Sequence, residues 1–83
     1  MKEKVYEILR EIEEEIVQYN GDQMMEDGIV DSFITLEIIE ALEDNFDIEI
    51  DAEYITKKNF ANKDKIVELV EQVIRNTKYE KGQ

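Results

Sequence analysis

The 83-residue sequence contains no cysteine, no histidine and no tryptophan, and these absences limit its chemistry. Without cysteine the chain forms no disulfide and offers no thiol nucleophile, which fits a reducing compartment and predicts a cytoplasmic location. Without histidine it has no imidazole to activate a serine or to bind a metal. A single small domain of this composition has to rely on its hydrophobic core for stability.

Positive charge is missing from most of the chain. The sequence has 10 basic and 22 acidic residues, and 16 of the acids lie between Glu11 and Thr56, where there is no Lys or Arg. Such a surface repels nucleic acid and anionic lipid, and it attracts basic patches on other proteins. No signal-peptide pattern and no apolar run of membrane length is present. We therefore expect a soluble monomer with protein partners, no nucleic-acid partner and no stable membrane insertion.

Apolar spacing of three and four residues predicts three main helices. The first runs from about Lys2 to Gln18 and ends at a left-handed cap on Asn20 or Gly21. The second begins at Asp31 or Ser32 and continues to about Phe46, and the third is capped by Asn62 and continues to about Asn76. The long first loop is expected to fold its four apolar residues over the core; these are Met24, Met25, Ile29 and Val30.

The segment 46–54 alternates apolar and polar residues, which by periodicity alone indicates a strand. A lone strand in a helical chain would leave its backbone groups unpaired, so we predict an extended loop that buries Ile48 and Ile50. A short helical turn is expected over 55–60, anchored by Phe60. The predicted fold is a small all-α bundle of three main helices and one short helix. It forms one domain over residues 1–77, with a frayed polar tail over 78–83.

The second helix has two distinct faces at 100° per residue. Its core face carries Ile34, Ile38, Ile39, Ala41, Leu42 and Phe46. Its outer face carries Ser32, Phe33, Leu36, Glu37, Glu40, Glu43 and Asp44. Two large apolar side chains beside a serine indicate a contact surface. The serine stands at the partly positive end of a helix, where an attached phosphate is favoured.

The residue types give little support for catalysis. Ser32 has no histidine, cysteine or nearby lysine to activate it, and an exposed Asp31 is a weak base for a hydroxyl. An EF-hand calcium loop also fails, because placing Gly28 at loop position 6 puts Gln23 at position 1 and Ile34 at position 12. We therefore predict no catalytic residue and no metal site.

Residues 28–33 read Gly-Ile-Val-Asp-Ser-Phe, and they are followed by Leu36-Glu37, Ala41-Leu42-Glu43 and Phe46-Asp47-Ile48-Glu49-Ile50. This stretch resembles the phosphopantetheine-attachment region of acyl carrier proteins. In that family an Asp-Ser-Leu sequence begins the second helix of a four-helix fold. Its serine carries 4′-phosphopantetheine transferred from coenzyme A.

The resemblance implies roles for individual residues. Ser32 corresponds to the attachment serine, and Asp31 to the neighbour that helps the transferase hold magnesium and coenzyme A. On the outer face, Phe33 and Leu36 are expected to contact partner enzymes. The acidic positions Glu37, Glu43 and Asp44 are expected to meet their Arg and Lys side chains. Glu40 also lies on this face.

Other residues depart from the fatty-acid-synthesis pattern. Ile34 replaces a common acidic residue, Glu40 a common apolar one, and Asp47 a frequent glycine. The stretches Lys57-Lys58-Asn59-Phe60 and Lys65-Ile66-Val67 are similar to D-alanine carriers and stand-alone peptide-synthetase carriers. The cargo stays open between fatty acyl, polyketide and amino acid.

The resemblance implies a non-enzymatic carrier with three kinds of partner: a phosphopantetheinyl transferase, a loading ligase, and a downstream synthase or transferase with basic docking patches. The alternative is an acidic protein-interaction module that has no prosthetic group. A serine at a helix start is most often only an N-cap, and in this alternative Ser32 has that role and carries no group.

Overall fold

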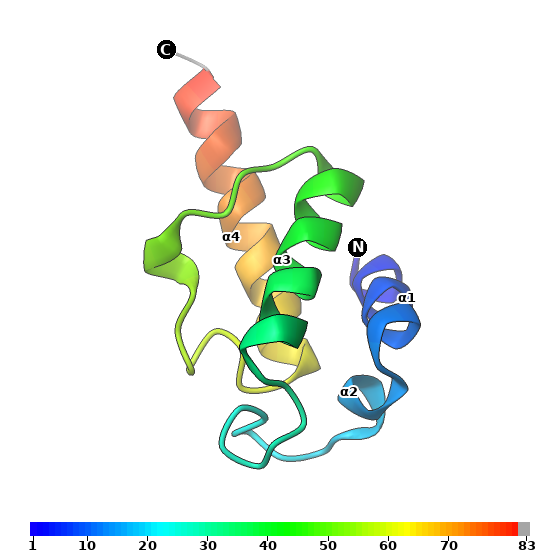
Figure 1. The fold of residues 1–83 in the computed structure, drawn as a ribbon. Helices are drawn as coiled ribbons and strands as arrows, with labels where there is room; N and C mark the ends of the chain where they lie inside the picture. The colour runs from blue at the N-terminus through cyan, green and yellow to red at the C-terminus, as the bar shows by residue number, and fades with distance from the viewer. Residues whose placement is uncertain (82–83) are drawn as a thin grey trace.

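The computed structural model describes the backbone of residues 1–81 and the side chains of residues 1–77. Its elements are α1 (Lys2–Ile12), α2 (Glu14–Gln18), α3 (Ser32–Phe46), the 3₁₀ helix η1 (Ala52–Tyr54) and α4 (Lys63–Lys81). The described part contains no strand, and α1 packs against both α3 and α4 (Figure 1). The predicted small all-α bundle is confirmed. Within residues 1–81, no helix has both the length and the hydropathy needed to cross a membrane.

The core is built from the apolar stripes of the helices together with residues of two long connections. The first connection, 19–31, joins α2 to α3, and the second, 47–62, joins α3 to α4. The side chains with less than 2 % exposure are Val5, Leu9, Ile16, Met24, Val30, Ile38, Leu42, Phe60, Ile66, Leu69 and Val70. Phe60 is fully buried, which confirms it as the anchor of the second connection. Ile50 is buried and Ile48 is half-buried, so the extended loop packs inward as predicted.

The first predicted helix is in fact two helices. The backbone at Glu13 is extended, with φ −161° and ψ 110°, and α2 starts at the next residue. Glu13 lies in a run of four carboxylates within five positions, where a continuous helix would place Glu11 one turn away from Glu14 and Glu15. Like charges at this spacing destabilise a helix. The break instead places Glu14 and Glu15 in the first turn of a new helix, where the helix dipole favours negative charge.

The predicted left-handed cap at Asn20 or Gly21 is wrong. The chain leaves α2 through Tyr19 in an extended conformation, and neither Asn20 nor Gly21 has a positive φ. A Cβ at Gly21 would collide with the Tyr19 hydroxyl group, so a larger residue there would have to displace the Tyr19 side chain. The predicted inward folding of the loop is confirmed, because Met24 and Val30 are buried and Met25 and Ile29 pack against the core.

The second connection and the last helix differ from prediction in their limits. The short helix lies at Ala52–Tyr54, ahead of the predicted 55–60, where the structure has a turn closed by the Phe60 N–H donating to the Thr56 carbonyl at 3.1 Å. The predicted cap on Asn62 is confirmed by its Oδ1 accepting from the Lys65 N–H at 2.9 Å. The last helix continues to Lys81, five residues beyond the predicted end at Asn76. Of the predicted frayed tail 78–83, residues 82–83 lie outside the described residues.

Candidate functional site

The start of α3 is fixed by Asp31, the residue before the serine. Asp31 Oδ1 accepts a hydrogen bond from the Ile34 N–H at 2.9 Å, which is the bond of an N-capping side chain. The Asp31 carbonyl accepts from the Thr35 N–H at 2.9 Å and from the Thr35 hydroxyl at 2.7 Å. Thr35 is buried, so its hydroxyl needs this partner. Together these bonds make Ser32 the first residue of the helix, as predicted.

Ser32 itself is exposed, as are Asp31 and Phe33 on either side of it. It therefore presents a hydroxyl at the end of a 15-residue helix where backbone N–H groups carry partial positive charge. Because the capping function belongs to Asp31, the Ser32 side chain is not the cap of α3. This geometry is suited to an anionic substituent on the serine oxygen.

The loop reaches this point through a tight reversal at Gly28. The Met24 carbonyl accepts from the Ile29 N–H at 2.9 Å and from the Val30 N–H at 3.4 Å. Gly28 closes the reversal with a φ of +80°, a conformation that side chains other than glycine rarely adopt. The first residue of the motif is thus a glycine for a conformational reason, and Val30 behind it is buried in the core.

A groove of about 610 Å³ opens beside Ser32. Its lining is mainly apolar and consists of Met25, Gly28, Val30, Asp31, Ser32, Thr35, Leu36, Ile39 and Ile55. Leu36 of α3 and Ile55 of the second connection both line it. Thr35 and Ile55 are not among the site residues predicted from the sequence. No local pattern in the sequence connects Ile55 with Ser32, because the two are brought together only by the packing of the second connection.

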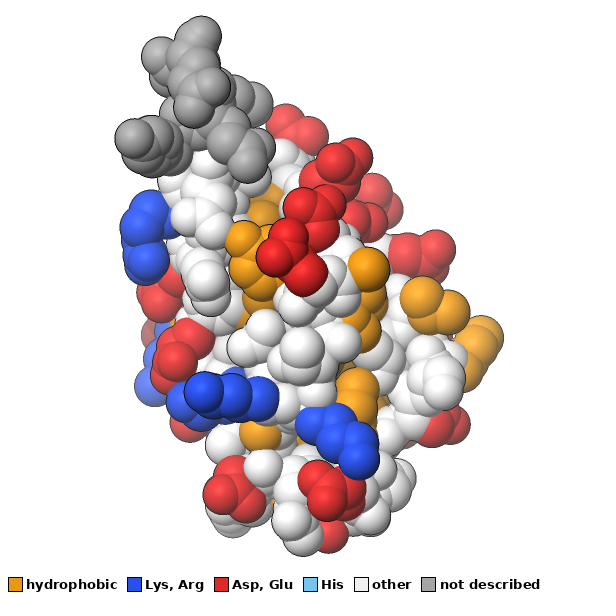
Figure 2. Space-filling view, turned by 90° about the vertical axis from the view of Figure 1, so that its left-hand side faces the viewer, with side chains coloured by type: hydrophobic (Ala, Val, Ile, Leu, Met, Phe, Trp, Pro, Cys, Tyr) orange, Lys and Arg blue, Asp and Glu red, His pale blue; other side chains and the backbone are white. Residues whose placement is uncertain are grey.

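Most of the proposed docking residues lie on the outer face of α3. Phe33 is 70 % exposed and Leu36 is 58 % exposed, and Glu37, Glu40 and Asp44 are also exposed. On the face shown in Figure 2, acidic side chains gather in the upper part and at the right, whereas Lys and Arg lie at the left and in the lower part, with further acidic side chains among them.

Glu43 differs from the other acidic residues of α3. It is half-buried, and its Oε2 accepts a hydrogen bond from the Ile50 N–H at 2.9 Å. Its carboxylate therefore holds the chain that follows α3.

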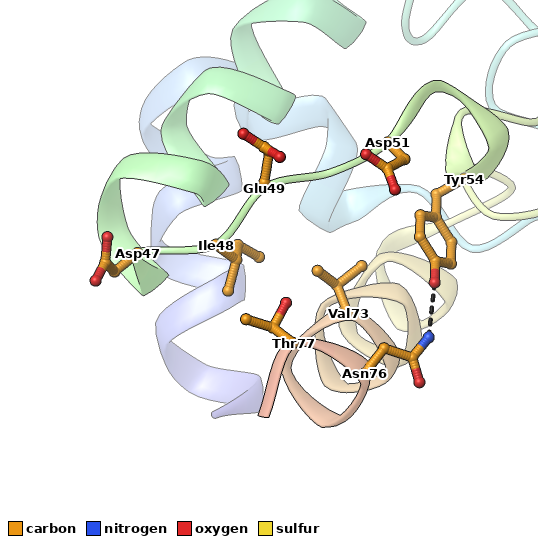
Figure 3. Close-up of a pocket in the computed structure, with 8 residues that line it drawn as sticks. All are labelled: Asp47, Ile48, Glu49, Asp51, Tyr54, Val73, Asn76 and Thr77. Atoms are coloured by element: carbon orange, nitrogen blue, oxygen red, sulfur yellow. Dashed lines mark hydrogen bonds between the residues drawn. The ribbon is translucent and has the colours of Figure 1, made fainter. Parts of the chain in front are cut away.

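A second hollow, of about 360 Å³, lies between this connection and α4 (Figure 3). Asp47, Glu49 and Asp51 line it, and the Tyr54 hydroxyl accepts from Asn76 Nδ2 at 2.7 Å. Of its lining residues, Asp47 lies at the opposite end of α3 from Ser32, about 22 Å away by helix rise. Within the described residues, no group of three or more His, Cys, Asp or Glu side chains is arranged to hold a metal ion.

No known protein-family model matches the chain. The likeness to acyl carrier proteins therefore rests on the residues between Gly28 and Ile50 and on their placement in the fold.

Proposed function

We propose that the protein is a carrier whose Ser32 hydroxyl receives 4′-phosphopantetheine from coenzyme A and which then presents acyl or aminoacyl groups to partner enzymes. The observation that carries this proposal is the position of Ser32: an exposed hydroxyl on the first residue of a helix that the preceding Asp31 already caps. The resemblance of the sequence from Gly28 to Phe33 to the attachment motif supports the same assignment.

The residues around Ser32 fit such a group. Its phosphodiester would be attached at the positive end of α3, where negative charge is stabilised. The apolar groove beside Ser32 offers Leu36 and Ile55 as neighbours for the less polar parts of the arm. When bound, the group supplies a thiol that holds the cargo as a thioester.

The chain's own residues have binding and positioning roles in this proposal. Asp31 caps α3 through its Oδ1 and so fixes the serine as the first residue of the helix. Phe33 and Leu36 provide apolar contact with partners, while Glu37, Glu40 and Asp44 steer basic patches toward α3. The protein raises the local concentration of a tethered substrate at each partner's active site and catalyses no step itself.

Intact-protein mass spectrometry tests the proposal directly. The chain is incubated with coenzyme A, magnesium and a promiscuous phosphopantetheinyl transferase, with Ser32→Ala in parallel. We expect one phosphopantetheinyl increment on the wild type, a new thiol on a cysteine-free protein, and no increment on the variant. A folded wild type that gains no mass, or a Ser32→Ala chain that gains it, contradicts the proposal.

The second candidate function is an acidic interaction module without a prosthetic group. It is favoured by the exposure of Phe33 and Leu36 beside the carboxylates of α3, which needs no modified serine. In this case a basic partner binds wild type and Ser32→Ala equally, and the mass of the chain does not change.

A further inference from the structure

Three consecutive residues at the start of α4 hold three different positions of the loop that leads to Ser32. Lys63 Nζ donates to the Tyr19 carbonyl at 3.3 Å, and Asn62 Nδ2 donates to the Gly21 carbonyl at 3.1 Å. The Ala61 carbonyl accepts from the Met24 N–H at 3.1 Å. We call Ala61, Asn62 and Lys63 the α4 clamp.

The clamp is connected to Ser32 through the loop backbone. The Met24 N–H donates to the Ala61 carbonyl of the clamp, and the Met24 carbonyl accepts from the Ile29 and Val30 N–H groups. Val30 is buried and is followed directly by the capping residue Asp31. The position of the loop beside the serine is therefore set by the start of α4, about 30 residues away in sequence.

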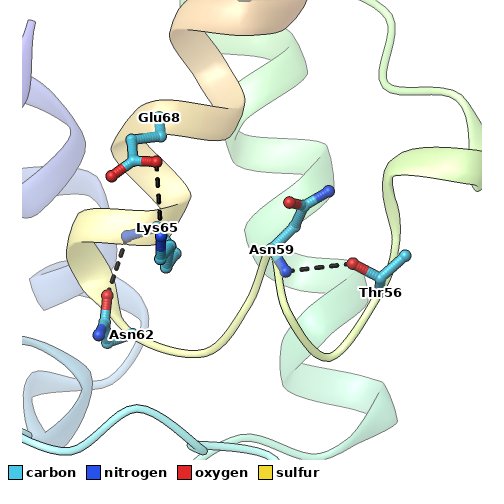
Figure 4. Close-up of polar contacts among 5 residues, drawn as sticks. All are labelled: Thr56, Asn59, Asn62, Lys65 and Glu68. Carbon is cyan, nitrogen blue, oxygen red and sulfur yellow. Dashed lines mark hydrogen bonds and ion pairs between the residues drawn. The ribbon is translucent and has the colours of Figure 1, made fainter.

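Asn62 is the member of the clamp with two tasks. Its Oδ1 caps α4 through the Lys65 N–H (Figure 4), and its Nδ2 holds the Gly21 carbonyl. The oxygen and the nitrogen of one amide thus serve the helix and the loop separately. Because an aspartate has the same oxygen but no N–H donor, Asn62→Asp separates the two tasks.

The rest of the loop is held mainly by its own residues. The Tyr19 hydroxyl donates to Asp27 Oδ2 at 2.6 Å and accepts from the Gln23 N–H at 3.0 Å. The hydrogen bond to Asp27 raises the pKa of the Tyr19 phenol. These contacts connect the start of the loop at Tyr19 to Gln23 and Asp27, on the far side of Gly21.

We propose that Asn62 is a positioning residue for the reaction at Ser32: by holding Gly21 it positions the loop whose Met25, Gly28 and Val30 line the groove beside the serine, where the loading transferase has to approach. This inference rests on the proposed carrier function. The chemistry at the serine hydroxyl depends on α3 and its Asp31 cap, which Asn62 does not touch. Loss of the Gly21 contact is therefore expected to weaken docking and to leave the chemical step unchanged.

The test is the steady-state kinetics of phosphopantetheine transfer to wild type and to Asn62→Asp. The matched control is Asn45→Asp, which adds the same charge and also removes an amide donor, here to the Ala41 carbonyl at 2.8 Å, but lies far from the loop. For Asn62→Asp we expect KM for the carrier to rise roughly three- to tenfold, with kcat within about twofold of wild type. Its melting temperature should stay close to that of wild type, because aspartate is a good N-cap.

Each outcome decides a different point. An unchanged KM in Asn62→Asp, or an equal rise in Asn45→Asp, overturns the positioning role while the carrier function stands. If the wild type is not loaded, the carrier function fails. Amide exchange then tests the clamp alone: Met24 and Ile29 should exchange faster in Asn62→Asp than in Asn45→Asp, and equal rates would overturn it.

Discussion

The carboxylate of Glu43 on α3 accepts a hydrogen bond from the backbone N–H of Ile50 at 2.9 Å, seven residues further along the chain. Ile50 is buried, so this bond fixes the point at which the second connection enters the core. The helix face proposed for docking therefore contains one acidic residue, Glu43, that also holds the backbone of the second connection.

Replacing Glu43 by alanine should destabilise the fold by about 1–2 kcal/mol, because a partly buried N–H loses a charged acceptor. Glu43→Gln keeps an acceptor oxygen and should lose less than half of that. Glu40→Ala is the matched control, since Glu40 is exposed and its removal should change stability by no more than about 0.5 kcal/mol. Urea denaturation measures all three, and equal stabilities for the two alanine variants would contradict the structural role of Glu43.

Asp47 ends α3 in the left-handed conformation, with φ 53° and ψ 51°. Glycine adopts this conformation without steric cost, so Asp47→Gly should stabilise the protein by about 0.5–1 kcal/mol. Asp47→Asn removes the same negative charge and serves as the control for charge repulsion. Thermal unfolding of both variants is the measurement. A glycine variant no more stable than the asparagine variant would show that backbone strain at Asp47 is insignificant.

Tyr6 connects α1 to α4 by donating a hydrogen bond to Asp64 Oδ1, and Lys2 and Lys63 lie over its ring. Burial, and then the bond to Asp64, raise the pKa of Tyr6 from 10.0 to about 12. A pKa raised by folding favours the neutral phenol in the folded state. Its contribution to stability is thus complete below pH 10 and is lost as the pH rises from 10 to 12.

The comparison of wild type with Tyr6→Phe isolates this effect, because the two proteins differ only in the Tyr6 hydroxyl group. The variant should be less stable than wild type at neutral pH, and the difference should shrink above pH 10. Absorbance titration of tyrosinate should also lose its most alkaline step in the variant. A variant that retains that step would assign the raised pKa to another tyrosine.

Reversing charge on the outer face of α3 should weaken docking of a loading enzyme. Glu37→Lys with Glu40→Lys is expected to raise KM for the carrier at low ionic strength, and the effect should diminish as salt screens charges beyond about 10 Å. Glu49→Lys with Glu53→Lys makes the same change in net charge on exposed residues of the second connection. Equal KM values for the two double variants would remove the docking role of α3.

The periodic segments of the sequence were sufficient to predict the all-α class, the start of α3 and the cap on Asn62. These features depend on local spacing and on capping side chains, which a sequence displays directly. The break at Glu13 was missed because the apolar stripe continues from Leu9 to Ile16 across it. The only feature of the sequence that indicated a break was the run of carboxylates from Glu11 to Glu15, whose mutual repulsion disfavours a continuous helix.

The candidate site was predictable where it is local and unpredictable where it is not. The exposed serine and the exposed Phe33 and Leu36 follow from the helical geometry of one segment. That Asp31 and not Ser32 is the N-cap was not predicted. Ile55 and the clamp residue Asn62 come from other parts of the chain, and no spacing rule places them near the loop. Tertiary packing alone determines these neighbours.

In Figure 1, α4 reaches past the level at which α3 ends, and its last described part projects from the bundle at the end opposite the α3 start. A label, a surface anchor or a fused domain joined beyond this helix would therefore sit well away from Ser32. A chain immobilised in this way would keep the serine, its groove and the acidic helix face turned toward solution, accessible to any enzyme added afterwards.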